Sequence, residues 1–296
     1  MQLSSTSPRG SENRLTSLDI FRNLPFISVH VACLAIFWTG ISPIAVGLGF
    51  LTLIIRMFGL TGGYHRYFCH KSFKTTRTFQ FVLAWIGTAA AQRGPLWWAG
   101  HHRSHHRHAD TAKDIHPPGV KGIFWAHAGW VMSRQNHRTK TEWVPDLMQD
   151  PELVWLDKNH YIAPITLGVT LFYIGEWLVE MYPALNTSGW QMLVVAFFCS
   201  TTVLYHVTFA VNSVGHLLGT RRFETDDESR NSFWLALVTG GEGWHNNHHR
   251  YPGSERQGFY WWELDFTHYV IVLLSWCRLV WNVRGPTPAV LQEGTS

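Results

Sequence analysis

The chain has 296 residues, of which 46% are hydrophobic and 15% are charged, and its formal net charge is +4 at pH 7. A net positive charge of this size does not indicate a nucleic-acid partner. The four cysteines, Cys33, Cys69, Cys199 and Cys277, form no C-x-x-C motif. Their spacing excludes an iron–sulfur or rubredoxin-like site within the chain and argues against a disulfide framework.

Four long apolar stretches lie along the chain, at residues 25–41, 44–62, 161–181 and 190–211. Each is close to the ~20 residues that a helix needs to cross a bilayer. Only a short break, such as Ser42-Pro43, separates the members of each pair, so we predict four transmembrane helices in two hairpins. A soluble protein with buried helices is the alternative, and four stretches of this length argue against it.

The remaining sequence consists of an N-terminal tail at residues 1–22, two long polar segments at residues 63–160 and 212–285, and a C-terminal tail at residues 286–296. The first tail lacks the pattern of a cleavable signal peptide. Of the 24 Lys and Arg residues, thirteen lie in the first polar segment and seven follow Val211, whereas the hairpin tips have none. Because Lys and Arg mark cytoplasmic loops, we expect both termini and both polar segments in the cytoplasm. We predict an all-α integral membrane protein with one domain, residues 23–285, in which the polar segments form a cytoplasmic helical cap.

Histidines are grouped at tight spacing in this predicted cap. The groups are His65-Arg-Tyr-Phe-Cys-His70, His102-Arg-Ser-His105-His106, Asn212-Ser-Val-Gly-His216 and His245-Asn-Asn-His248-His249. In an H-x-x-H-H run, the histidines at i, i+3 and i+4 share one face of a helix. His65 and His70 are five residues apart and therefore ~140° out of register on an α-helix, so we expect this pair to straddle a helix end.

Imidazole is the commonest metal-binding side chain, although any single run could consist of structural histidines. The repetition of the pattern favours a histidine-rich dinuclear metal site, because nine histidines exceed the ligand number of one ion. Nitrogen ligands suit Fe, Zn, Cu or Ni. A zinc hydrolase usually has three protein ligands and a water on one ion, so a two-ion, all-nitrogen site beside a membrane favours iron and dioxygen chemistry.

These motifs resemble those of the membrane-bound fatty acid desaturases, most closely the acyl-CoA (stearoyl-CoA) Δ9 type, from about Gly59 to about Phe266. The family has one H-x4-H box and two H-x2-HH boxes, separated by paired transmembrane hairpins. The specific strings are Gly62-Gly63-Tyr64-His65-Arg66, Gly94-Pro95-Leu96-Trp97-Trp98, Asn212-Ser-Val-Gly-His216 and Gly241-Glu242-Gly243-Trp244-His245-Asn246-Asn247-His248-His249.

The resemblance implies an enzyme that uses two Fe²⁺ ions, O2 and two electrons to insert a cis double bond, which we expect at Δ9, into a saturated long-chain acyl substrate. The iron ligands that it implies are His65, His70, His102, His105, His106, His216, His245, His248 and His249, with Asn212 holding a water on one iron. The other histidines, such as His108, His137 and His160, have no such spacing, and we expect structural roles for them.

Behind these ligands, we expect four residues that contact and orient the ligand rings: Asp110, Asp114, His116 and Glu242. Metal-bound imidazoles normally donate their other N–H to such an acceptor. Ordinary solvated charge is the alternative for the acidic residues.

Five residues are expected to line the tunnel for the acyl chain: Leu53, Met57, Trp98, Thr208 and Phe209. Leu53 and Met57 are one turn apart on one face of a helix, and we expect them to set the length of chain that fits. Simple packing against neighbouring helices is the alternative.

The acyl carrier is less well defined by the sequence. Animal acyl-CoA enzymes have an arginine where this chain has Gly100, so a basic contact to a CoA head group is missing there. We expect an acyl-CoA substrate, with an acyl-lipid as the alternative.

Two other functions are compatible with the same sequence features. An acyl or alkyl hydroxylase on this scaffold would have the same ligand spacing, and oxygen in the product would distinguish it. A non-catalytic membrane metal-binding protein is the more distant alternative, although transporters place polar ligands near the bilayer midplane rather than in a cap.

No haem-binding or C-x-x-C motif supplies electrons from within this sequence. We therefore expect a separate donor: cytochrome b5, a ferredoxin or a rubredoxin, with its reductase. The bacterial inner membrane is the favoured location and the endoplasmic reticulum is the alternative.

Overall fold

The computed structural model describes residues 17–295, and these residues are almost entirely helical. The chain begins with α1 (Ser17–Ala32), the 3-10 turn η1 (Cys33–Ala35), α2 (Ile36–Thr39), α3 (Pro43–Phe58), the π-helical segment η2 (Gly59–Cys69), β1 (Lys74–Thr75) and α4 (Arg77–Thr88). The first polar segment continues with α5 (Pro95–His108), α6 (Pro118–Lys121), the π-helical η3 (Trp125–Gly129), α7 (Trp130–Met132), the 3-10 turns η4 (Arg134–Asn136), η5 (Thr141–Trp143) and η6 (Leu147–Gln149), and α8 (Pro151–Lys158).

The second half begins with α9 (Ile162–Met181), the 3-10 turn η7 (Pro183–Leu185), α10 (Gly189–Gln191), the π-helical η8 (Met192–Cys199), α11 (Ser200–Ser213) and the 3-10 turn η9 (Val214–His216). It ends with α12 (Phe233–Thr239), α13 (His245–Arg250), α14 (Phe266–Trp276), β2 (Val280–Trp281) and α15 (Pro288–Glu293).

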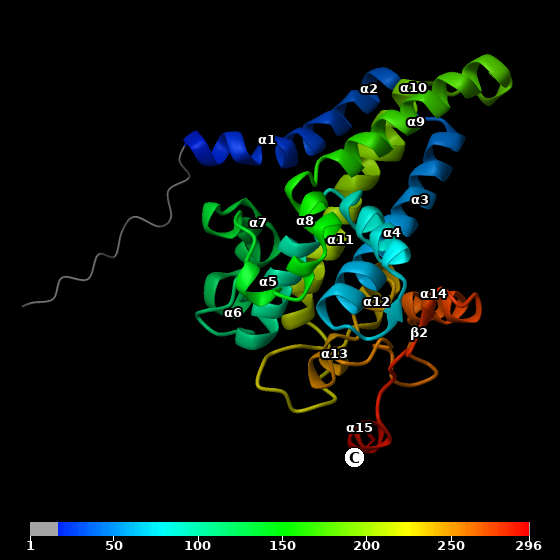
Figure 1. Cartoon of the computed structure of the whole chain (residues 1–296). Helices are drawn as coiled ribbons and strands as arrows, with labels where there is room; N and C mark the ends of the chain where they lie inside the picture. The colour runs from blue at the N-terminus through cyan, green and yellow to red at the C-terminus, as the bar shows by residue number, and fades with distance from the viewer. Residues whose placement is uncertain (1–16, 296) are drawn as a thin grey trace, which may run out of the picture.

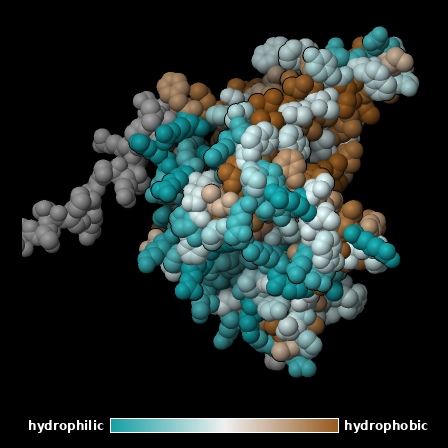
Figure 2. Space-filling model, viewed as in Figure 1, coloured by the Kyte–Doolittle hydropathy of each residue, from teal (hydrophilic) through white to brown (hydrophobic). Residues whose placement is uncertain are grey.

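Four continuous helical segments are long and apolar enough to cross a membrane: Phe21–Thr39, Pro43–Cys69, Ile162–Met181 and Gly189–His216. They correspond to the four predicted apolar stretches. Figure 1 shows the shorter helices α5, α6 and α13 gathered at one end of the long helices. In Figure 2 hydrophobic residues gather around the long helices, and hydrophilic residues cover the end with the shorter ones. The predicted division into apolar helices and a polar cap is therefore visible on the surface.

The first helix begins earlier than predicted. Residues 1–16 lie outside the described part of the chain, but α1 already begins at Ser17, within the segment expected to be a polar tail. Pro25 lies inside α1, where its missing N–H interrupts the backbone hydrogen bonds of the helix.

Helix α3 is fixed at its start and near its end by polar side chains. The Ser42 hydroxyl caps it by accepting a hydrogen bond from the Ala45 N–H at 3.2 Å, and Pro43 occupies the first turn, where no N–H is needed. Near the other end, the buried guanidinium of Arg56 donates to Thr201 Oγ1 and Ser200 Oγ on α11, both at 2.6 Å. The single charge of this apolar stretch therefore joins the two hairpins.

Segment η2 explains how His65 and His70 come together. Its hydrogen bonds span five residues, and the His70 N–H donates to the His65 carbonyl at 3.2 Å. A π-helical segment places residues i and i+5 one turn apart, so the two imidazole rings lie 4.9 Å apart between centroids. The α-helical register assumed in the sequence analysis was wrong for this segment, but the pair does straddle a helix end, since η2 ends at Cys69 and His70 is its C-cap.

The C-terminal segment is also more ordered than a tail. Helix α15 buries Val290 against Phe223 and Phe259, and Arg250 forms an ion pair with Glu293. Just before it, β2 pairs with β1 in an antiparallel two-stranded ribbon, with Thr75 opposite Val280. The fold therefore includes one small β-ribbon in addition to the predicted helices, and it continues beyond residue 285.

Helix α4 packs on η2 through glycines, which gives a stability prediction. A Cβ at Gly87 would lie 2.4 Å from a ring carbon of Tyr64 and 2.9 Å from the Gly59 carbonyl oxygen. Overpacking of this kind costs about 1–3 kcal/mol, so Gly87→Ala should lower the thermal unfolding temperature in detergent. At Gly47 a Cβ meets nothing within 4 Å, so Gly47→Ala, on the exposed face of α3, should leave that temperature unchanged or raise it. Equal effects of the two variants would contradict this packing.

Candidate metal centre and acyl cavity

Nine histidines from η2 and its C-cap, α5, η9 and α13 meet in the cap. In each of two groups, one possible ligand atom per residue lies within 4.8 Å of all the others. The first group consists of His65, His70, His102, His106 and His248, and the second of His105, His216, His245 and His249. All nine are ligand residues predicted from the sequence. The two groups adjoin each other, because the rings of His106 and His249 are stacked with centroids 4.4 Å apart.

Helices α5 and α13 contribute to both groups. On α5, His102 and His106 face the first group, whereas His105 faces the second. On α13, His248 belongs to the first group, and His245 and His249, one turn apart, belong to the second. An H-x-x-H-H run therefore supplies two neighbouring sites from one helix face.

The first group holds its ring nitrogens at nearly constant spacing. The Nε2 atom of His248 lies 3.0 Å from that of His65 and 2.9 Å from that of His106. The Nε2 atoms of His70 and His102 are 3.0 Å apart. One ring has a carboxylate partner, since His65 Nδ1 contacts a Glu242 oxygen.

Glu242 is itself held by a buried charge network. Arg66 donates to Glu242 Oε1 at 3.0 Å and lies 2.9 Å from Asp265 Oδ1. Arg66 and Asp265 are at most 1% exposed, so their charges compensate each other out of water. Despite its burial, the pKa of Glu242 is lowered by His65 and Arg66, and the carboxylate is ionised.

The second group has three carboxylate partners. His105 Nδ1 lies 2.9 Å from Asp114, His216 Nδ1 lies 2.8 Å from Asp110, and His249 Nδ1 lies 2.7 Å from Asp227. The contacts of Asp110, Asp114 and Glu242 are those expected from the sequence. The sequence analysis missed Asp227 for two reasons. It lies in an acidic run, Asp226-Asp227-Glu228, which is typical of solvated surface charge, and it is far in sequence from His249.

His116 makes no such contact to a ligand ring. Its own ring packs beside that of His105, with centroids 4.3 Å apart, and its Nδ1 is buried without a hydrogen-bond partner. Its expected role as an acceptor for a ligand ring stays a prediction.

Burial keeps most of these imidazoles neutral. Loss of hydration, together with the neighbouring histidines, holds the pKa of His70, His102 and His106 well below the usual value. Burial lowers the pKa of His249 to about 4, although Asp227 opposes this shift. Asp114 has a lowered pKa because His105 outweighs the cost of its burial. The site therefore consists of mainly neutral rings beside ionised carboxylates.

This donor set fits metal ions. An ionised carboxylate only accepts hydrogen bonds, so His216 and His249 donate from Nδ1 to Asp110 and Asp227 and turn Nε2 towards the other rings. Their Nε2 atoms lie 3.0 and 3.1 Å from that of His245. Converging ring nitrogens on histidines that a carboxylate holds from behind are the donor set of a metal site.

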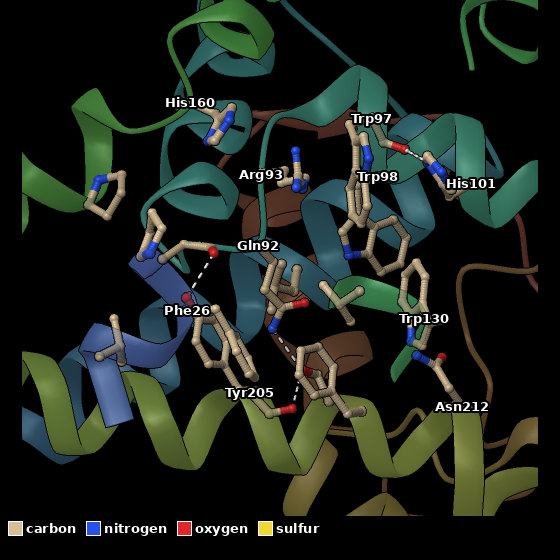
Figure 3. A pocket seen from close by; sticks show the side chains of 18 of the residues that line it. Phe26, Gln92, Arg93, Trp97, Trp98, His101, Trp130, His160, Tyr205 and Asn212 are labelled. Carbon is tan, nitrogen blue, oxygen red and sulfur yellow. Dashed lines mark hydrogen bonds between the residues drawn. The ribbon is translucent and has the colours of Figure 1, made fainter. Parts of the chain in front are cut away.

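A large apolar cavity leads to both groups. Its volume is about 980 Å³, and it is lined by His65 and His102 of the first group and by His105 and His245 of the second. Figure 3 shows its aromatic walls, which include Phe26, Trp97, Trp98, Trp130 and Tyr205, and Asn212 beside them on α11. A chain-shaped apolar ligand can therefore lie directly beside the imidazoles.

Four of the five predicted tunnel residues line this cavity: Met57, Trp98, Thr208 and Phe209. Leu53 is not among the lining residues, so its expected place was wrong. At that level α3 packs closely on the second hairpin, where Gly49 approaches the Ala196 backbone and Arg56 reaches Ser200. These contacts leave no room for a cavity beside Leu53.

Some histidines that were set aside also face the cavity. His137 and His160 line it, as does His101, and none has a sequence spacing that signals this.

The expectation about Gly100 changes as well. A Cβ there would lie 2.8 Å from the Lys140 carbonyl oxygen, so no side chain fits, and the glycine says nothing about a CoA contact.

Comparison with known proteins identifies the family. The model of the fatty acid desaturase family matches residues 41–273. An sn-2 palmitoyl-lipid 9-desaturase of Nostoc sp. (strain 36) is 36% identical over 255 residues, covering 83% of this chain and 85% of the relative. An sn-1 stearoyl-lipid 9-desaturase of Anabaena variabilis is 36% identical over 262 residues, covering 88% and 91%. An icosanoyl-CoA 5-desaturase of Limnanthes douglasii is 32% identical over 291 residues, covering 97% and 76%. The resemblance found in the sequence is thereby confirmed: this chain belongs to the fatty acid desaturase family, whose members are oxidoreductases acting on fatty acyl chains.

Proposed function

We propose that this protein inserts a cis double bond at Δ9 of a saturated long-chain acyl substrate, with O2 as co-substrate and two iron ions held by the two histidine groups. The observation that carries the proposal is the continuity between cavity and histidines. Trp98 stacks on His102, with ring centroids 5.0 Å apart, and both line the cavity. An acyl chain in the cavity therefore passes beside the imidazoles without crossing water.

The two groups supply the ligands for one ion each. His65, His70, His102, His106 and His248 would hold the first ion. His105, His216, His245 and His249 would hold the second, with Asn212, which lines the same cavity as His245, holding a water on it.

When bound, the iron ions would let O2 accept two electrons, two protons and the two hydrogens from adjacent carbons, which leaves a double bond and two waters. The protein's own residues position the chain for this reaction. Gln92 donates to Thr208 Oγ1 at 2.7 Å across the cavity wall, and both residues line it. This bond joins the segment between α4 and α5 to α11 at the cavity wall, and the aromatic lining excludes water from the reacting carbons.

The electrons would come from a separate protein, such as cytochrome b5, a ferredoxin or a rubredoxin with its reductase. The charge distribution supports an integral membrane protein with both termini and the histidine groups on the cytoplasmic side, and the bacterial inner membrane as its location. The relatives' names include lipid-linked and CoA-linked chains, so both carriers are candidates.

The central test compares two histidine variants. His245→Ala removes a nitrogen of the second group and should abolish desaturation and lower metal content, while the protein still inserts into the membrane. His108→Ala is the matched control, because its ring packs beside Trp143, with centroids 6.0 Å apart, and belongs to neither group. Gas chromatography with mass spectrometry of cells that also express an electron donor should show a new monoene with the native chain and His108→Ala only. An active His245→Ala variant would contradict the metal assignment, and a hydroxylated product would contradict desaturation.

A second test concerns the aspartate that the sequence did not reveal. Loss of an acceptor behind a metal-bound histidine typically weakens metal affinity about 10–100-fold. Asp227→Asn should therefore lose iron to a competing chelator at a lower chelator concentration than the native protein. The exposed neighbour Asp226 gives the control, and Asp226→Asn should retain iron like the native protein. Equal retention by both variants would show that Asp227 does not support a ligand.

A third test uses the two positions on α3. Met57 lines the cavity and Leu53 does not, so Met57→Phe should shift the products towards shorter chains, because the larger ring fills the cavity. Leu53→Phe should leave the chain-length distribution unchanged. A larger shift with Leu53→Phe would mean that the acyl chain runs along another path.

A further inference from the structure

The first histidine group has two sides. Two of its members line the apolar cavity, whereas His70 and His106 do not. Each of these two is followed directly by an exposed basic residue, Lys71 after His70 and Arg107 after His106, so both lie just beneath the outer surface of the cap. The group therefore borders the cavity on one side and a basic surface on the other.

Four basic residues form this surface, and we call them the basic face: Lys71, Arg103, Arg107 and Arg284. Arg284 donates to the His70 carbonyl at 2.9 Å and also contacts the Lys71 carbonyl. Arg103 donates at 3.1 Å to the carbonyl of the residue before His70. Arg107 follows Arg103 one turn later on the same face of α5. The face is therefore built directly on the backbone that carries His70.

The positive charge of the basic face is only partly compensated. Lys71 and Arg103 both form ion pairs with Asp146, at 2.7 and 2.6 Å. Arg107 and Arg284 form no ion pair with any residue that the structure describes. One carboxylate thus stands against four cations, and a surface of this kind attracts negatively charged partners and speeds their association.

The basic face is separate from the path of the acyl substrate. None of its four residues lines the cavity, whose lining contains two other arginines, Arg22 and Arg93. From the exposed Lys71, in contrast, the chain reaches a histidine of the first group in one residue, and His70 Nε2 lies 3.0 Å from His102 Nε2. The face therefore offers a short covalent route to the histidines without opening the cavity.

The position of the face favours a protein partner over lipid head groups. Lys71 follows the apolar segment Pro43–Cys69, and a basic residue at such an end suits a head group. Arg103 and Arg107 belong to α5, however, and Arg284 follows β2, and neither element is part of the four segments that are long and apolar enough to cross a membrane. Three of the four charges are therefore carried by the cap, which hydrophilic residues cover in Figure 2.

We propose that the basic face is the docking surface of the electron donor, and that this donor is a small acidic one-electron carrier protein. It binds over His70 and His106, on the side of the first group that faces away from the cavity. Two reduced carriers bind in turn, and each is oxidised by one electron. These two electrons are the ones that O2 takes up in the proposed reaction. The inference rests on the proposed desaturase function and specifies where its electrons enter.

Charge reversal at Arg107 tests this docking surface. Arg107 forms no hydrogen bond or ion pair with other described residues, so Arg107→Glu changes the charge of the face without breaking a bond within it. Lys121→Glu is the matched control, because Lys121 is exposed on α6, and Figure 1 shows α6 and β2 on opposite sides of the cap. The iron-loaded native protein and both variants are placed in phosphatidylcholine nanodiscs and titrated with an acidic [2Fe–2S] ferredoxin and, in parallel, with the acidic haem domain of cytochrome b5.

Arg107→Glu should raise the Kd for the carrier at least about tenfold, because like charges that meet at an interface oppose association. Lys121→Glu should bind like the native protein, and added salt should weaken native binding by screening. Equal weakening by both variants, or a native protein that binds neither carrier at low salt, would overturn the inference. An unchanged Kd for Arg107→Glu would also overturn it, and a simultaneous loss of phosphatidylglycerol bound to this variant would assign the face to lipid head groups.

Cross-linking locates the contact without turnover. The Lys71 side chain is 59% exposed, so a carbodiimide should couple its amine to a carboxylate of the bound carrier, and mass spectrometry should recover the joined peptide. Coupling mainly through Lys121 would place the carrier on the other side of the cap and would contradict the proposed face.

A single-turnover measurement separates the docking surface from the desaturase function. Native protein that is reduced chemically and then exposed to O2, with a stearoyl-CoA or a stearoyl-lipid present, should form a monoene without any carrier. Failure to form it, with carrier binding that still depends on Arg107, would contradict the desaturase function and leave the docking surface in place. Monoene formation with carrier binding that is indifferent to Arg107 would overturn the docking surface alone.

Discussion

The convergence of nine imidazole rings is the constraint on which the rest of the structure depends. In the second group, the Nε2 atoms of His216 and His249 lie 3.0 and 3.1 Å from that of His245. Asp110 and Asp227 contact the other nitrogen of the first two rings and fix their orientation. Polar atoms out of water need a partner, and the proposed function assigns a metal ion to each group of ring nitrogens.

The long helices hold histidines of both groups at their ends. Segment η2 extends α3 and carries His65, and η9 extends α11 and carries His216. The hydrogen bonds from Arg56 to α11 fix the two hairpins relative to each other, and with them these two histidines. The same helices enclose the apolar cavity, so one scaffold sets the place of both the cavity and the histidines beside it.

The sequence predicted the long helices, the polar cap and the nine histidines, because hydropathy and H-x-x-H-H spacing are local patterns. It could not assign histidines to groups, since His105 and His106 are neighbours on α5 yet face different groups. It placed Leu53 wrongly because helix periodicity shows a shared face but not the close packing at Gly49 and Arg56. The role of Asp227 depends on its contact with His249 from a distant segment, for which a single sequence carries no local signal.

The measurement that tests the account most directly is the iron content and Mössbauer spectrum of the purified protein after growth on isotopically enriched iron. The account predicts two iron ions per chain in two distinguishable environments. One group has a single carboxylate behind its five histidines, and the other has three carboxylates behind its four. One iron per chain, or zinc in place of iron at full desaturase activity, would contradict it.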